Sequence, residues 1–168
     1  EMCIRDSTVG NYEYGFFWYL YLDGTIQMEV KLTGIIGVSA VAEGGERADM
    51  APLVAPNVTS PIHQHLFCFR LDFNIDGINN SVYEVEAEPL PIGEDNPQGT
   101  AFRAKSTLLE SERQAQRDCY PQRSRYWKVV NPERKNGLGK AVAWKLLPSA
   151  TPTLLAHEAV SYTHLRAH

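Results

Sequence analysis

Cysteine is scarce in this chain, with three among 168 residues. The three are far apart in the sequence, so neither a disulfide framework nor a structural zinc site is expected. Cys68 and Cys119 could pair, but we expect two buried free thiols. No apolar run approaches the ~18 residues of a membrane span, and the formal net charge of −4 provides no basic footprint for nucleic acid. These absences predict one globular domain that binds neither membranes nor nucleic acids.

The two ends of the chain differ from the rest. Residues 1–7 (EMCIRDS) and 161–168 (SYTHLRAH) resemble translated read-through of sequencing adapters, and we expect both to be non-native tails. Residues 1–7 contain neither a basic region nor an apolar core, so they do not form a secretory signal. The fold and function are therefore predicted from residues 8–160.

Strand signals dominate the first half. Residues 16–22 are rich in aromatics, which suit a pleated surface, and Asp23-Gly24 predicts a type I′ hairpin turn. Residues 25–33 alternate between apolar and polar side chains, as in a strand with one solvated face. The Gly- and Pro-rich residues 43–61 predict a long loop.

The second half predicts more strands than helix. We expect strands at residues 65–73, 82–87, 100–109, 125–130 and 141–147, with a turn at Asp76-Gly77 and a second long loop at 89–99. Leu108 to Arg117 is the one stretch that favours a helix. Many short strands joined by turns predict an all-β fold, an antiparallel β-sandwich.

Two motifs carry the candidate chemistry. Residues 8–14 read TVGNYEY, which places Tyr12 between an asparagine and an acid, and His63-Gln64-His65 follows about fifty positions later. On a strand, side chains at i and i+2 share a face, so both imidazoles can point at one metal ion, and imidazole suits Cu, Zn, Fe and Ni. A packed tyrosine and a buried, hydrogen-bonded histidine pair are the structural alternatives. A cupin would have a glutamate soon after its H-x-H motif, whereas here the next glutamate is Glu84.

Together, these motifs resemble the copper-containing amine oxidases, whose pattern Thr/Ser-x-x-Asn-Tyr-Asp/Glu-Tyr/Asn matches residues 8–14 at every specified position. The resemblance implies that Tyr12 is the precursor of topaquinone, a quinone that is electrophilic toward primary amines. It also implies that Asn11 helps to orient the quinone and that Glu13 completes the flanking motif.

The resemblance further implies a set of metal ligands. His63 and His65 correspond to two copper(II) ligands. Asp72, through its carboxylate, and Phe73, through its carbonyl, correspond to a second site for Ca²⁺ or Mn²⁺, ions that favour oxygen ligands. A solvated turn aspartate is the alternative for Asp72. His157 matches no ligand of the family and is not assigned to a metal.

The function implied by the resemblance is oxidation of a primary amine by O₂ to an aldehyde, ammonia and hydrogen peroxide, in a protein that is a homodimer. In the family, the catalytic aspartate precedes the tyrosine and the third copper histidine lies far beyond the H-x-H pair. We therefore expect this chain to be an internal piece of the catalytic β-sandwich that is inactive alone. The alternative is a non-catalytic β-sandwich that binds metal or a partner, which would lack that aspartate or histidine in the full-length gene.

Overall fold

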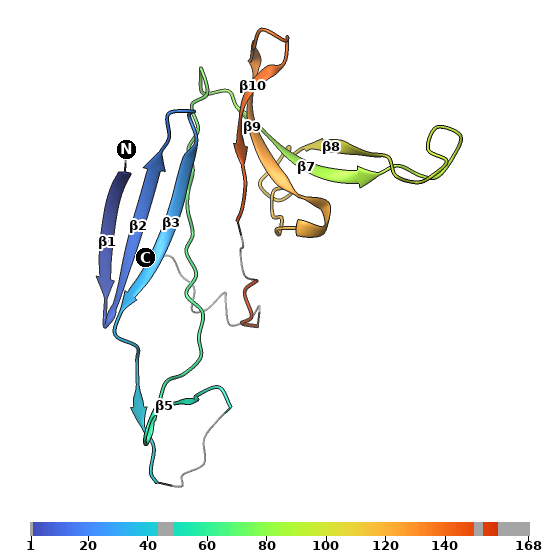
Figure 1. Cartoon of the computed structure of the whole chain (residues 1–168). Helices are drawn as coiled ribbons and strands as arrows, with labels where there is room; N and C mark the ends of the chain where they lie inside the picture. Colours follow the sequence, from blue (N-terminus) through green and yellow to red (C-terminus); the bar gives the residue numbers. More distant parts are fainter. Residues whose placement is uncertain (1, 44–48, 150–152, 158–168) are drawn as a thin grey trace. The chain divides into compact units, whose positions relative to one another are not determined.

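The structure, a computed structural model, is an all-β arrangement of antiparallel strands, as predicted. It describes residues 2–43, 49–149 and 153–157, and the chain divides into two compact units, residues 1–65 and 66–168. Figure 1 labels the strands. The first unit contains β1 (Met2–Val9), β2 (Tyr12–Leu20), β3 (Ile26–Gly34), β4 (Ser39–Ala40), β5 (Leu53–Ala55) and β6 (Val58–Thr59), and the second contains β7 (Ser81–Pro89), β8 (Phe102–Leu108), the short 3₁₀ helix η1 (Pro121–Arg123), β9 (Tyr126–Lys135) and β10 (Ala141–Leu146).

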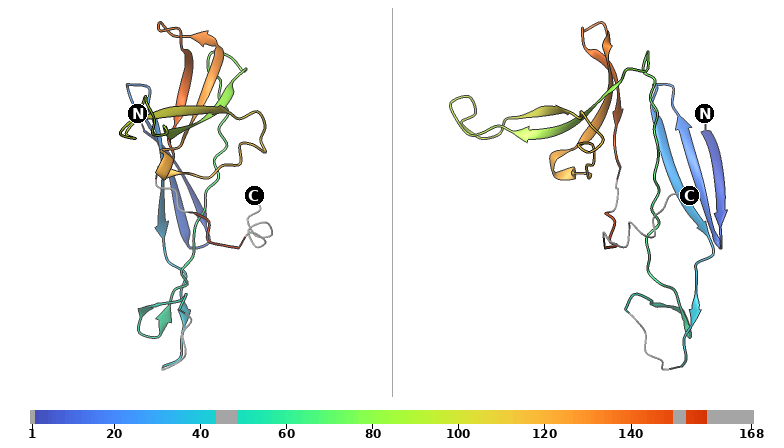
Figure 2. Two further views of the ribbon diagram at one scale, coloured as in Figure 1. Left: turned by 90° about the vertical axis from the view of Figure 1, so that its right-hand side faces the viewer. Right: turned by 180° about the vertical axis from the view of Figure 1, so that it is seen from behind.

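The first unit is built on a three-stranded sheet in the order β1-β2-β3, whose strands lie side by side in the right-hand view of Figure 2. A two-residue turn with Gly10 at φ 61° joins β1 to β2. Between β2 and β3 the Gly24 N–H donates to the Tyr21 carbonyl, and Gly24 has φ 86°. Asp23 does not have a positive φ, so the predicted turn is present but is not type I′, which requires positive φ at two successive residues.

A smaller sheet, in the order β4-β6-β5, follows in the same unit. Ser39 pairs with Thr59, and the Val41 N–H donates to the Asn57 carbonyl at 2.8 Å. The predicted loop over residues 43–61 thus contains two short strands, β5 and β6, while residues 44–48 lie outside the described part. The two ends of this loop are thus paired with each other, and the second end lies just before the histidine pair.

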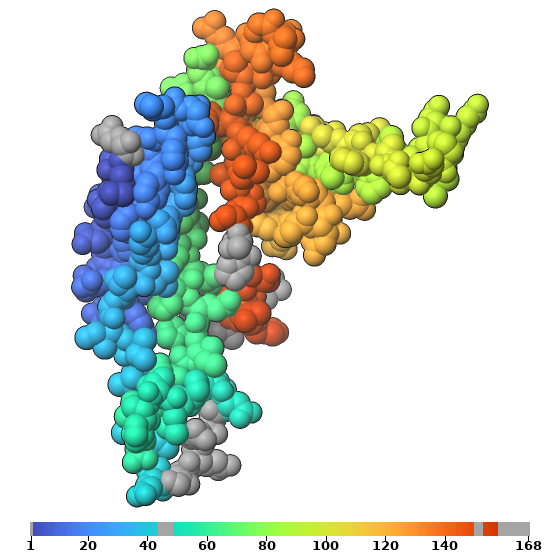
Figure 3. Space-filling model, viewed as in Figure 1, coloured from blue at the N-terminus to red at the C-terminus, as the bar shows by residue number. Residues whose placement is uncertain are grey.

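The second unit is a four-stranded sheet in the order β10-β9-β7-β8. Its buried apolar side chains within the described ranges are few: Ile75, Val85, Val129 and Val130. The loop that joins β7 to β8 extends beyond the sheet as the yellow-green arm of Figure 3, which agrees with the predicted loop over residues 89–99.

Acidic side chains of β7 form ion pairs in this sheet. The buried Glu84 carboxylate lies 3.3 Å from Arg125 and 3.4 Å from Arg117, and Arg125 also contacts Glu86. The Glu84–arginine contacts have the distance of ion pairs but not the geometry of hydrogen bonds, because Glu84 Oε2 has no hydrogen-bond partner. At the exposed end of β7, Glu88 pairs with Arg103 and Lys105.

Besides the turn type, three predictions are wrong: the strand over residues 65–73, the burial of two thiols and the helix over residues 108–117. Residues 65–73 form no strand, and burial nevertheless alternates, with positions 65, 67 and 69 more covered than their neighbours. The alternation has the period of a strand, but these residues are part of no ladder of paired strands. Cys68, in the same segment, is exposed, and Cys119 is half-buried. Both are free thiols as predicted, but neither is buried.

The predicted helix at residues 108–117 is a single turn, closed by the Ala115 N–H to the Ser111 carbonyl at 3.0 Å. Its side chains from 111 to 118 are all exposed, so no apolar stripe stabilises further turns. No helix within the described residues is long and apolar enough to cross a membrane.

Candidate metal and cofactor site

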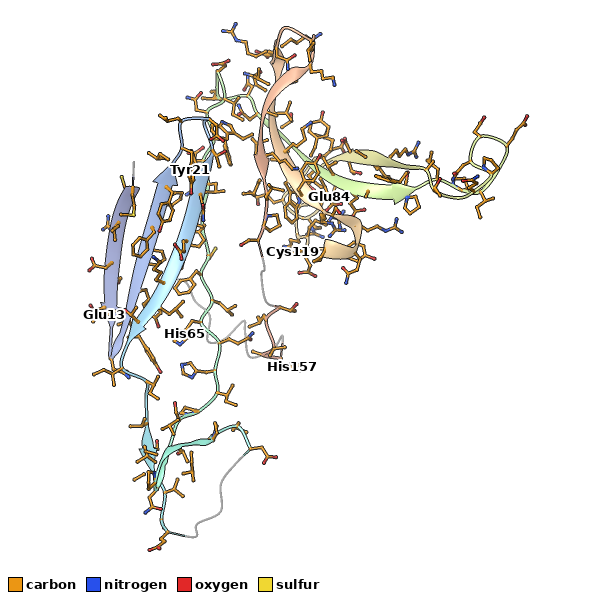
Figure 4. All side chains as sticks on the ribbon, in the orientation of Figure 1. Glu13, Tyr21, His65, Glu84, Cys119 and His157 are labelled. Atoms are coloured by element: carbon orange, nitrogen blue, oxygen red, sulfur yellow. The ribbon has the colours of Figure 1, made fainter. Side chains whose placement is uncertain are left out.

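Tyr12 is the first residue of β2 and lies beside both histidines of the H-x-H motif. Its hydroxyl is 3.2 Å from His63 Nε2, and its ring centroid is 4.9 Å from that of His65, in an edge-on orientation. The two imidazole centroids are 4.6 Å apart. Figure 4 labels Glu13 and His65, which come from β2 and from the segment after β6. The structure therefore brings together the tyrosine and the two histidines.

The hydrogen bonds of His63 and Tyr12 have fixed directions. His63 Nδ1 lies 2.8 Å from the Pro61 carbonyl, which can only accept, so in the neutral imidazole Nδ1 carries the proton and Nε2 has the lone pair. The Tyr12 hydroxyl accepts from the Gly37 N–H at 3.2 Å and can donate its own proton to His63 Nε2. A chain of donors thus runs from Gly37 through Tyr12 to His63.

A second tyrosine–histidine pair lies next to the first. Tyr14 Oη is 2.9 Å from His65 Nδ1, and both side chains are half-buried. The separation in sequence is 51 in both pairs, Tyr12 with His63 and Tyr14 with His65. The two segments therefore run in the same direction here, and the period-two spacing of Y-x-Y matches that of H-x-H.

Asn11 holds the chain that follows β3 against this site. Its backbone carbonyl accepts from the Ile35 N–H at 2.8 Å, and its side-chain amide donates to the Ile35 carbonyl. These bonds fix the chain two residues before Gly37, the donor to Tyr12. The structure shows no direct contact of the Asn11 side chain with Tyr12 among these bonds, and the role of Asn11 in orienting a quinone stays a prediction.

The other predicted site residues are Glu13 in the first unit and Asp72 and Phe73 in the second. Glu13 is exposed, on the opposite face of β2 from Tyr12. Asp72 is exposed and Phe73 half-buried, in the unstranded segment of the second unit. Across the described ranges, no group of three or more His, Cys, Asp and Glu side chains could hold a metal ion. The roles of these residues stay predictions.

The residues present fit part of a copper centre. His63 is already in the form that binds a metal through Nε2, and a ligating histidine commonly donates its other N–H to a carbonyl, as His63 does to Pro61. His65 adds a second imidazole, and paired imidazoles suit Cu(II). Within the described residues no third His, Cys, Asp or Glu side chain joins the two imidazoles in a group that could hold a metal ion.

Three contributors to this site have no role predicted from the sequence: Tyr14, Gly37 and Pro61. Gly37 and Pro61 are the two that lie outside the motifs. Both act through backbone atoms, which leave no side-chain signature. Tyr14 was in the motif without a role, and the shared period of Y-x-Y and H-x-H is the signal that could have found it.

Comparison with known proteins places the whole chain in one group. The family model described as "Copper amine oxidase, enzyme domain" matches residues 2–168. A histamine oxidase from Arthrobacter globiformis is 47% identical over 148 residues, which are 88% of this chain and 21% of that protein. A peroxisomal copper-containing diamine oxidase from Nicotiana tabacum is 41% identical over 84% of this chain and 18% of its own length. The chain thus spans about a fifth of the length of these relatives.

Solved structures agree with the sequence relatives. A copper-containing benzylamine oxidase from Hansenula polymorpha superimposes with a TM-score of 0.82 at 27% identity, over 94% of this chain and 25% of that one. The chain has the fold of part of that enzyme.

Proposed function

Because this chain belongs to the copper amine oxidase enzyme-domain family, we propose that its full-length protein oxidises primary amines, with Tyr12 as the topaquinone precursor and His63 and His65 as copper ligands. The overall reaction takes an amine, O₂ and water to an aldehyde, ammonia and hydrogen peroxide. The observation that carries the proposal is the 3.2 Å contact between the Tyr12 hydroxyl and His63 Nε2, with the His65 ring beside both.

The cofactors supply what side chains lack: bound copper and the quinone made from Tyr12 provide the oxidising power. The chain's own groups hold the reacting parts in place. The Pro61 carbonyl keeps the His63 Nδ1 proton, so Nε2 is available as a ligand. The Gly37 N–H holds the Tyr12 hydroxyl at that same nitrogen.

The test replaces each histidine in the full-length protein. His63→Ala and His65→Ala should each abolish tight copper binding and, as a consequence, the conversion of Tyr12. Metal analysis measures the first, and reaction with phenylhydrazine measures the second. His157→Ala is the control, because His157 is not assigned to the site. Full copper content and quinone in the double histidine variant would contradict the assignment.

The alternative, a non-catalytic β-sandwich that binds metal or a partner, remains distinguishable. It requires that the full-length gene lack the upstream aspartate or the downstream histidine of the family. The motif match at residues 11–14 and the convergence of Tyr12 with both histidines favour the enzyme.

Two further features of the full-length protein follow from family membership as proposals. It forms a homodimer, which light scattering of the purified protein would measure. Asp72 and Phe73 bind Ca²⁺ or Mn²⁺, and Asp72→Asn should then lower the content of that metal without changing the copper content.

A further inference from the structure

We propose that Tyr14 is a positioning residue for His65: its hydroxyl accepts the Nδ1 proton of His65, so that both histidines present the same nitrogen, Nε2, to the metal. This inference rests on the proposed function, in which both imidazoles are copper ligands. Its direct observation is the 2.9 Å contact between Tyr14 Oη and His65 Nδ1.

His63 has the tautomer of its neutral imidazole fixed by its neighbour. The Pro61 carbonyl 2.8 Å from Nδ1 has no proton to give, so that nitrogen must be the donor. A neutral imidazole has one protonated and one bare nitrogen, and here the bare one is Nε2. His63 is therefore set for metal binding before any metal arrives.

His65 has the corresponding contact through a different group. A hydroxyl can accept or donate, so Tyr14 alone permits either tautomer. Ligation through Nε2 requires that nitrogen to be bare, and the proton then lies on Nδ1 and is donated to Tyr14 Oη. The two imidazoles, with centroids 4.6 Å apart, are thereby matched in tautomer.

The position of Tyr14 in the sheet suits it to hold the His65 ring in one tautomer. It is in the interior of the central strand β2, where its backbone pairs with Leu32 of β3 and with β1 on the other side. A residue fixed on both sides provides a rigid support for a ligand. Tyr14 and His65 are half-buried, so water competes less for the hydrogen bond than it would at the surface.

The hydroxyl can be removed without removing the ring. The rings of Tyr14 and His65 also pack, with centroids 5.6 Å apart, and phenylalanine keeps that contact. Tyr19→Phe is a matched control on the same strand: it also deletes one hydroxyl, which donates to Glu29 at 2.9 Å, on the opposite face.

The experiment measures Cu²⁺ affinity in full-length protein that carries Tyr12→Phe, which prevents quinone formation and separates metal binding from activity. Loss of a partner to a metal ligand typically lowers affinity about 10–100-fold. Tyr14→Phe should therefore raise the Kd for Cu²⁺ by about 10–100-fold and alter the copper EPR hyperfine couplings, whereas Tyr19→Phe should leave both unchanged. Equal affinities for the two variants would overturn the proposal.

Two further measurements keep the outcomes separate. If His63→Ala and His65→Ala retain wild-type copper affinity, the proposed function has failed; if they lose it while Tyr14→Phe does not, only the role of Tyr14 has failed. Should Tyr14→Phe not fold, solid-state NMR of ¹⁵N-histidine-labelled, metal-free Tyr12→Phe protein reads the tautomer directly. A proton on His65 Nδ1 supports the proposal, and a proton on Nε2 overturns it.

Discussion

At the scale of single residues, the site is held by backbone atoms as much as by side chains. The Tyr12 hydroxyl lies between the Gly37 N–H and the bare nitrogen of His63. Both partners come from segments that follow β3, so a small displacement of either would change the position of the reacting ring. The glycine is the more sensitive of the two, because it has no side chain and its backbone N–H lies 3.2 Å from the hydroxyl.

Gly37 is the first residue at which this can be tested. A β-carbon at this position would meet the Tyr12 hydroxyl at 3.4 Å, and the branched side chain of valine would extend further. Gly37→Val should therefore displace the hydroxyl and slow formation of the quinone in the full-length protein, followed by its visible absorption after copper is added. Gly137→Val is the control, since nothing lies within 4 Å of its β-carbon. Equal rates for the two variants would show that the space beside Tyr12 is not needed.

At the scale of elements, strand ends and cross-strand pairs position the site. Gly34 ends β3 opposite Tyr12, with φ 97°. The charged pairs of β7 stabilise the second sheet by two different means: one pair is covered and the other is exposed to water. Each of these features predicts a distinct response to substitution.

Gly34→Ala should destabilise the full-length protein more than Gly24→Ala. Both glycines have positive φ, which for other residues costs of order 1–3 kcal/mol. Only at Gly34 would the new β-carbon also meet backbone, 2.5 Å from the Asn11 carbonyl oxygen. Guanidinium unfolding midpoints of the two variants provide the comparison. A larger loss of stability for Gly24→Ala would contradict the prediction and would mean that the backbone around Gly34 can move to make room for a β-carbon.

Arg125→Ala should be strongly destabilising, by about 3–5 kcal/mol, because it leaves the buried Glu84 carboxylate without one of its charge partners. Arg125 also contacts Glu86 and donates to the Asp118 carbonyl. Arg103→Ala breaks the exposed pair with Glu88, which lies on the same strand as Glu84. The loss of stability should be small. Unfolding midpoints again decide, and similar losses for both would show that burial of Glu84 does not matter.

The exposed pair predicts a dependence on pH. Lys105 and then Arg103 hold the pKa of Glu88 below its ordinary value of 4.5. Because the folded pKa is the lower one, the stabilisation is fully present above the unfolded pKa and is lost as the pH falls through the folded pKa. The difference in thermal midpoint between the wild type and Glu88→Gln should therefore shrink as the pH is lowered from neutrality to below 4.5. A difference that grows with acid would reverse the sign.

At the scale of the whole chain, the described part contains part of a catalytic domain. Only a few apolar side chains are buried, while large ones such as Ile35 and Trp144 are exposed. The outer strands of each sheet present unpaired edges, which favour association with other chains. Because the chain spans only about a fifth of the length of its relatives, we expect parts of the full-length protein to cover some of these surfaces.

We therefore expect residues 8–160 alone to form no quinone. The described residues gather two imidazoles at Tyr12 and no third acidic, thiol or imidazole ligand. Expression of this segment, addition of Cu²⁺ in air and reaction with phenylhydrazine would test the expectation, with the full-length protein as the positive control. A coloured, hydrazine-reactive product from the segment would contradict it.

The sequence predicted what depends on side-chain patterns. Alternation over residues 25–33 identified β3, and the two motifs identified Tyr12, His63 and His65 as neighbours. Sequence patterns failed at residues 65–73, where burial has the period of a strand but no ladder of paired strands forms. They also failed where backbone atoms act, as at Gly37. The nature of residues 1–7 stays a prediction, although residues 2–7 extend β1 along β2, and residues 161–168 lie outside the described part.

The closed base of the loop after β4 has a consequence for protein engineering. Ser39 pairs with Thr59, the Val41 N–H bonds the Asn57 carbonyl, and the Ser60 hydroxyl donates to the Gly37 carbonyl at 2.9 Å. The loop itself bonds back to this segment, because the Ile62 N–H donates to the Met50 carbonyl at 2.7 Å and the Ser60 N–H donates to the Pro52 carbonyl at 3.1 Å. An epitope or fluorescent label inserted between residues 50 and 62 should therefore disturb the position of His63, so an engineered insertion should leave this stretch intact.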